Sequence, residues 1–290
     1  MKLPVLRCLV FLVLFGSQLH AGERLQVAVS IIPQKILVER IGQQHVNVQL
    51  MVQPGHNPVT YEPTPRQMVG LSKADIYYRI GVPFEHSWMG RILDSYPELA
   101  VLDARNGVKL RQLQDAGHGK QGHEHGEGEP DPHIWLSPPL IRIMAMRLRD
   151  RLIELDPAHQ NAYVKNHAQL DASLLQLHTD IRSILSGLST RRFMVYHPSW
   201  GYFADTYGLQ QVSIESEGKE PGAQTMARLL DKARKSGVGS IFVQKQFSQA
   251  QARSVANEIG ARIVVIDSLA DDYPENLRAV ARAMVQGAVN

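Results

Sequence analysis

The sequence of 290 residues contains one cysteine, Cys8, and this residue lies in the extreme N-terminal segment. The chain after that segment therefore has neither a thiol nor a disulfide. Any metal site in it must use His, Asp, Glu or water as ligands. The fold must also be stabilised by a hydrophobic core, and the chain is long enough to bury one.

The sequence also has little net charge. Lys and Arg together number 31, Asp and Glu number 28, and Lys2 and Arg7 account for most of the excess. This balance gives no reason to expect binding to nucleic acid. With 44% hydrophobic and 20% charged residues, the composition is that of a globular protein of one large or two smaller domains.

The apolar run at residues 8–15, CLVFLVLF, is too short to span a membrane as a helix. Lys2 and Arg7 give it a basic flank, and residues 19–21, Leu-His-Ala, have the pattern of a cleavage site. We therefore predict that residues 1–21 are a signal peptide for secretion. An N-terminal membrane anchor is the alternative, and the length of the run disfavours it.

The first part of the mature chain alternates between strand and helix patterns. Residues 24–31 and 45–52 alternate in polarity as strands do, and residues 33–41 between them have helical spacing. Such a βαβ unit implies a parallel sheet. The same patterns predict further strands at 74–80 and 99–102 and helices at 65–73, 85–94 and 138–155.

The last part of the chain repeats this alternation. Its patterns predict strands at 192–196, 210–214, 240–243 and 262–266, and helices at 199–207, 225–236, 248–259 and 277–286. Between the two parts, residues 157–186 read as one helix, and about 30 residues would span about 45 Å. We therefore predict an α/β fold with two doubly wound lobes, an N-terminal lobe at 24–156, a linking helix at 157–187 and a C-terminal lobe at 188–290.

Histidines gather in residues 117–135, GHGKQGHEHGEGEPDPHIW. His118, His123 and His125 lie in a polar loop at 117–129, which has no apolar periodicity. His133 follows, in a segment where prolines and apolar residues return. A His-rich tract indicates a transition metal, although a solvated linker is the alternative for the loop taken alone.

Candidate ligands also follow two predicted strands. His197 comes directly after the strand at 192–196, and Asp267 follows the strand at 262–266. Ligands of open α/β sheets bind beyond the carboxyl ends of the strands, so two facing lobes could bring His133, His197 and Asp267 to one site. Two imidazoles and a carboxylate suit Zn²⁺, with Mn²⁺ or Fe²⁺ possible. Taken singly, His197 could merely end a strand and Asp267 could cap a turn.

The chain resembles the zinc/manganese-specific solute-binding proteins of bacterial ABC transporters over nearly all of its mature length. The motifs that carry the resemblance are YEPTP at 61–65, DPHIWLSP at 131–138, HPSWGYFADTYGL at 197–209, ESEGKEP at 215–221 and VIDSLA at 265–270. The resemblance implies two α/β lobes joined by a long helix, a metal ion between them and no catalysis. It also implies a monomer in the periplasm that delivers the ion to a membrane permease.

The resemblance matches His133, His197 and Asp267 with three metal ligands of the family. Histidine at the position of His197 is typical of the zinc binders, whereas manganese binders tend to have Glu there. A His-rich loop before DPHIW is another feature of zinc members. The resemblance therefore implies zinc as the metal.

One family ligand has no counterpart in this chain. The family places a histidine two residues before the Tyr of Tyr-Glu-Pro, and this chain has Val59 there. We expect either that His56, three residues earlier, takes over, or that three ligands are completed by water, a loop histidine, or a carboxylate such as Glu62 or Glu217. Glu217 and its neighbours Glu215 and Glu220 could otherwise form a solvated acidic loop or orient ligating histidines.

Two other functions are compatible with parts of this pattern. A zinc hydrolase also keeps three protein ligands and a water, but the sequence has no His-Glu-x-x-His motif and no recognisable nucleophile elbow. A metallochaperone or a surface adhesin could use the same scaffold. We expect a binding protein rather than an enzyme.

Overall fold

The computed structural model describes residues 23–113, 130–215, 224, 226–227, 230–231, 239–247 and 249–287. The predicted signal peptide and the His-rich loop at 117–129 lie outside these residues, as do most of the predicted helix at 225–236 and both Glu217 and Glu220.

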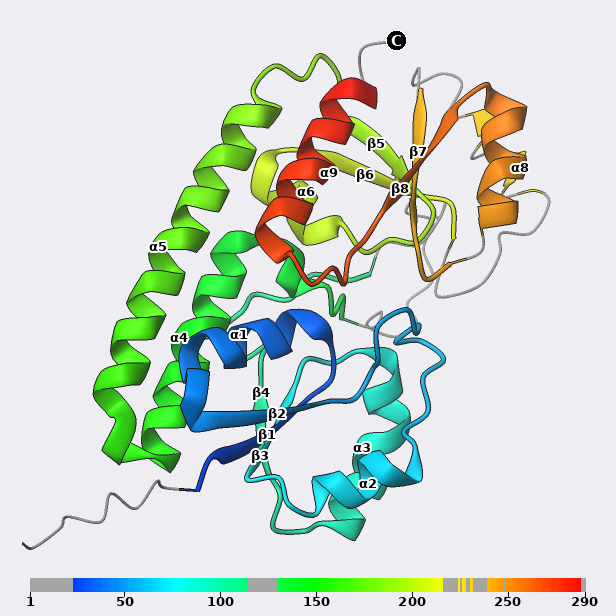
Figure 1. The fold of residues 1–290 in the computed structure, drawn as a ribbon. Coiled ribbons are helices and arrows are strands. Elements are labelled where there is room, and N and C mark those ends of the chain that lie inside the picture. The colour runs from blue at the N-terminus through cyan, green and yellow to red at the C-terminus, as the bar shows by residue number, and fades with distance from the viewer. Residues whose placement is uncertain are drawn as a thin grey trace, which may run out of the picture.

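The N-terminal lobe is built on a parallel four-stranded sheet with the strand order β2-β1-β3-β4 (Figure 1). Its strands are β1 (Leu25–Val29), β2 (Val46–Leu50), β3 (Ile76–Arg79) and β4 (Ala100–Asp103). Its helices are α1 (Ile32–Gly42), α2 (Pro65–Leu71) and α3 (Pro83–Ser95), and a 3₁₀ turn, η1 (Gln43–His45), leads into β2. Each helix has a proline in its first turn, where the missing N–H is not needed.

The C-terminal lobe repeats this arrangement with the strand order β6-β5-β7-β8, again parallel. Its strands are β5 (Arg192–Val195), β6 (Gln210–Ser213), β7 (Ser240–Gln244) and β8 (Arg262–Ile266). The described helices are α6 (Gly201–Tyr207), α8 (Gln249–Ile259) and α9 (Tyr273–Gly287). The predicted α/β fold with two parallel sheets is confirmed, and in each sheet the first strand of the lobe lies inside the sheet.

Two long helices pack against each other on one side of the molecule, and the longer of them runs along both lobes (Figure 1). They are α4 (Pro138–Leu155) and α5 (Gln160–Leu185), and the 3₁₀ turns η2 (Ile134–Leu136) and η3 (Pro157–His159) precede them. The predicted single helix at 157–186 thus begins with η3, and α5 itself has 26 residues, or about 39 Å. No described helix is long and apolar enough to cross a membrane.

Helix α5 is fixed to both lobes, which makes it a strut rather than a flexible linker. The amide of Asn166 donates to the carbonyl oxygen of Ile41 in α1 over 2.9 Å. At the other end, Arg278 of α9 forms an ion pair with Asp180 at 2.9 Å. A continuous cluster of buried apolar side chains, which includes Leu174 and residues of both sheets, fills the space between these anchors.

Candidate metal centre

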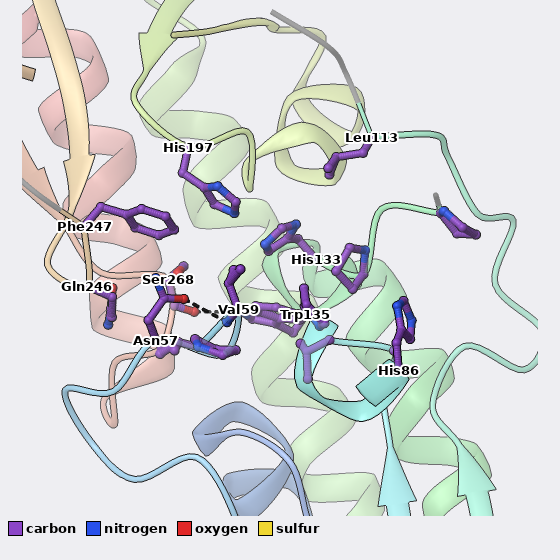
Figure 2. A pocket seen from close by; sticks show the side chains of 17 residues that line it. Asn57, Val59, His86, Leu113, His133, Trp135, His197, Gln246, Phe247 and Ser268 are labelled. Carbon is purple, nitrogen blue, oxygen red and sulfur yellow. Dashed lines mark hydrogen bonds between the residues drawn. The ribbon is translucent and has the colours of Figure 1, made fainter. Parts of the chain in front are cut away.

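A cavity of about 360 Å³ lies between the lobes, at the ends of strands from both sheets (Figure 2). The N-terminal lobe contributes the loops after β2 and β3, with Asn57, Val59 and the start of α3. The C-terminal lobe contributes His197 and Phe247. Carboxyl ends of parallel strands meet at this edge, so the cavity lies where ligands of such sheets are expected.

His133 is held by the aspartate two residues before it. The carboxylate oxygen Oδ1 of Asp131 accepts the backbone N–H of His133 at 3.0 Å and lies 2.7 Å from its Nδ1. Asp131 is fully buried, and Pro132 stiffens the backbone between the two residues. A carboxylate on Nδ1 fixes the tautomer and leaves Nε2 available as a ligand.

His197 has a similar carboxylate partner. Its Nδ1 lies 3.3 Å from Oε1 of Glu215, and its ring stacks on Phe247 with centroids 4.4 Å apart. Burial lowers the pKa of His197, so its ring is neutral at neutral pH, as metal binding requires. Glu215 is only 3% exposed. The interpretation of Glu215 as part of a solvated acidic loop is therefore wrong, because its carboxylate is buried beside His197.

The two imidazoles lie at a separation that suits one ion. The ring centroids of His133 and His197 are 5.3 Å apart, and the ring planes meet at 72°. Two imidazoles bound at about 2.0 Å to one tetrahedral zinc ion have ring centroids roughly 5 Å apart. The structure therefore brings two of the four predicted ligands into a pair that could hold one ion.

Asp267 lies next to the cavity, but its carboxylate is engaged elsewhere. Oδ1 accepts the backbone N–H of Leu269 at 2.9 Å and the side-chain amide of Gln246 at 3.1 Å, and Oδ2 lies 3.4 Å from Nζ of Lys245. These contacts are those of a residue that caps a turn. Asp267 as a ligand stays a prediction, and it requires the carboxylate to leave this turn.

His56 is turned toward a different surface hollow. That hollow is lined by Lys35 and Glu62 among others, and the ring of His56 meets the edge of Tyr61 with centroids 5.9 Å apart. His56 as the replacement for Val59 also stays a prediction. Within the part of the chain that the structure describes, no three His, Cys, Asp or Glu side chains form a group that could hold a metal ion.

Asp131, the partner of His133, is itself held in place by residues that the sequence does not indicate. Arg111 lies with its guanidinium 3.6 Å from Oδ2 of Asp131 and 3.3 Å from Asp205. Tyr202 of α6 donates to the carbonyl oxygen of Asp131 at 2.9 Å, and its hydroxyl accepts the backbone N–H of Arg111 at 3.0 Å. A Cβ at Gly201 would lie 1.1 Å from the guanidinium, so any other residue there would push this end of Arg111 out of its place. Nothing in the local sequence around Arg111 indicates this role, because its partners lie far along the chain.

Two α/β lobes on a rigid helix, with a pair of oriented histidines in the cavity between them, define a two-lobed binding protein. The family model described as zinc-uptake complex component A, periplasmic, matches residues 27–287. The chain belongs to this family, whose members are binding proteins and not enzymes.

Similarity to individual zinc-binding proteins supports the same family assignment. The chain is 29% identical over 264 residues to the high-affinity zinc uptake system protein ZnuA of Bacillus subtilis, covering 88% of this chain and 81% of that protein. It is 28% identical over 281 residues to the zinc-binding lipoprotein AdcA of Streptococcus pneumoniae, covering 94% of this chain. It spans only 55% of that lipoprotein's length.

Solved structures of ZnuA have the same fold. One crystal structure of ZnuA is 36% identical and superposes with a TM-score of 0.83, covering 92% of this chain and all of the other. A zinc-bound deletion mutant of ZnuA is 35% identical, with a TM-score of 0.84 over 92% of this chain and 99% of the other. The fold and the family are therefore established independently of the cavity.

The buried carboxylates behind the histidines give a testable expectation. We expect Asp131→Ala and Glu215→Ala each to weaken zinc binding roughly 10- to 100-fold, because each frees the imidazole that it orients. The matched variants Asp131→Asn and Glu215→Gln keep the shape and one acceptor oxygen, so their losses should be smaller. Calorimetric titration of zinc into each variant measures this. Equal affinities in wild type and both alanine variants would show that the carboxylates do not orient the ligands.

Proposed function

We propose that the protein binds one zinc ion between its lobes outside the cytoplasm and delivers it to the permease of an ABC transporter. The observation that carries this proposal is the pair His133 and His197, each with a buried carboxylate on Nδ1 and with centroids 5.3 Å apart. Family membership supports the delivery step, since the matched family is that of a zinc-uptake complex component.

The ligand set that we propose is His133, His197 and Asp267, with the fourth position supplied by the N-terminal lobe or by water. Asp267 would exchange its bonds to Gln246 and Leu269 for the ion. Such an exchange suits a carrier, because a carboxylate that has other hydrogen-bond partners can bind the ion and can also release it. His56 could reach the ion only after its loop turns away from Tyr61.

The donor chemistry favours zinc over manganese or iron. Imidazole suits zinc, manganese prefers sites richer in oxygen, and divalent affinity rises from manganese through iron to zinc at a given site. Calorimetric titration of the mature protein, residues 22–290, with each metal is the test. We expect one tight zinc ion per chain, with iron and manganese bound successively more weakly. A chain that binds no zinc tightly, or that binds manganese more tightly than zinc, would contradict the proposal.

The remaining features fit a secreted carrier. We propose that residues 1–21 direct export to the periplasm, and that the lobes at 24–156 and 188–290 act as a monomer around the linking helix at 157–187. The residues that flank the His-rich loop, Leu113 and Pro130, both line the cavity. We propose that His118, His123 and His125, which lie outside the described residues, collect zinc for the site.

A further inference from the structure

The N-terminal lobe lacks its expected histidine at Val59, yet it brings another histidine to the cavity. From the loops after β2 and β3 and the start of α3, the described residues that line the cavity are Asn57, Pro58, Val59, Gly81, Val82, Pro83 and His86. His86 is the one described residue among them with an imidazole, carboxylate or thiol, the groups that hold zinc in proteins. In the view of Figure 2, His197, His133 and His86 follow one another in a row.

The backbone around His86 is firmly anchored. His86 lies in the first turn of α3, directly after two fully buried residues, Phe84 and Glu85. The carboxylate of Glu85 accepts the backbone N–H groups of Ile80 at 2.9 Å and Gly81 at 2.7 Å, and the hydroxyl of Ser30. The side chain of His86 is exposed, by contrast. A fixed backbone that presents an exposed imidazole to a cavity is what a ligand position requires.

The start of α3 is also tied to the loop that carries Val59. The backbone N–H of Phe84 donates to the carbonyl oxygen of Pro58 at 3.1 Å, and the rings of Phe84 and Tyr61 meet edge to face at 5.5 Å. Phe84 thus ties the first turn of α3, which carries His86, to Pro58, the neighbour of Val59, where the family ligand is missing. His56 lies in the same loop but lines the other hollow.

We propose that His86 supplies the metal ligand of the N-terminal lobe, completing with His133 and His197 a site of three imidazoles. This inference rests on the proposed function, and it names the residue that takes over from Val59. No described trio is yet close enough to hold an ion, so His86 reaches the ion as the lobes approach each other. Because His86 and His197 belong to different lobes, zinc binds the state in which the lobes have come together more tightly than the state in the structure, and it stabilises that closer state. Three imidazoles also select zinc over manganese.

Zinc titration of the mature protein and its His86→Ala variant tests the assignment. We expect the zinc affinity to fall by about a hundredfold, because water replaces one imidazole of the four-coordinate ion. The thermal midpoint of the metal-free variant should stay unchanged, since the replaced side chain is exposed. His178→Ala serves as the control, because His178 contacts Tyr207 and does not line the cavity.

A second measurement separates ligation from an indirect effect. X-ray absorption at the zinc edge should count one imidazole fewer in His86→Ala than in wild type. Adding Val59→His to that variant should restore the lost affinity, since both side chains line the cavity from the same lobe. Wild-type affinity and an unchanged imidazole count in His86→Ala would overturn the inference, as would a loss that falls on His56→Ala instead. If His133→Ala also kept tight binding, the proposed function itself would fail.

Discussion

Replacing His197 by alanine is expected to weaken zinc binding by at least about a thousandfold, or about 4 kcal/mol. The variant loses one of the two imidazoles whose separation, 5.3 Å between ring centroids, suits binding to one ion. Of the preformed pair only His133 would remain. The other proposed ligands, Asp267 and His86, both have to be brought to the ion, since Asp267 is held in its turn and no described trio is yet close enough. The variant therefore keeps a single preorganised imidazole.

His197→Ala also removes the partner of a buried carboxylate. Glu215 is 3% exposed, and Oε1 lies 3.3 Å from Nδ1 of His197. An unpaired buried acceptor costs about 1–3 kcal/mol, so the metal-free variant should also be less stable than wild type. The two effects are separable, because denaturant unfolding in a chelator reports the second and zinc titration at a temperature well below unfolding reports the first.

The matched control is His178→Ala, an imidazole truncation on α5 away from the cavity. It should leave zinc affinity at the wild-type value. If His197→Ala bound zinc as tightly as His178→Ala, the paired histidines would not be the site. If both variants lost affinity equally, the loss would reflect a damaged fold and the His178 result would expose it.

The strands and helices that surround this site could be predicted from the sequence because they depend on local patterns. Alternating β-branched residues and helical spacing give the strands and helices to within a few residues, and His133 and His197 follow from motif and strand-end position. The confirmed fold is therefore largely a consequence of periodicity, with proline placing the starts of α1, α2 and α3.

What the sequence could not predict depends on contacts between distant segments. Arg111 contacts Asp131 in its own lobe and Asp205 in the C-terminal lobe, and no spacing rule connects these three positions. Asp267 could be read either as a ligand or as a turn cap, and the structure shows the cap contacts. His86 lies in the first turn of α3, and the cavity that it lines exists only after both lobes have folded.

Replacing Trp135 by alanine is expected to lower the free energy of unfolding by about 3–5 kcal/mol. The indole is 1% exposed in the core, and its N–H donates to the carbonyl oxygen of Ser268 at 2.7 Å. The hydroxyl of Tyr273 donates in turn to the carbonyl oxygen of Trp135 at 2.8 Å. Trp135 therefore packs the segment that carries His133 against the C-terminal lobe, and alanine would leave both a cavity and an unpaired carbonyl.

Two variants divide this effect into its parts. Trp135→Phe keeps much of the buried ring and removes the indole N–H, so it should lose only about 1–2 kcal/mol. Trp88→Ala is the matched control at a partly exposed indole, which stacks with Arg91 at 5.0 Å, and its loss should be much smaller. Urea unfolding of the mature protein in a chelator measures all three. A loss below 1 kcal/mol in Trp135→Ala would contradict the packing role.

Trp135→Ala should also weaken zinc binding, because Trp135 helps to position His133. The ring of His133 lies 5.0 Å from the indole of Trp135, and the η2 turn that begins beside His133 is docked on the C-terminal lobe through Trp135. His133 and His197 therefore belong to one rigid unit, although His133 precedes the linking helix in sequence. Approach of the N-terminal lobe then adds a ligand to a preformed pair without moving that pair apart. We accordingly expect Trp135→Ala to lose zinc affinity even under conditions where the variant is fully folded, and Trp135→Phe to retain most of it.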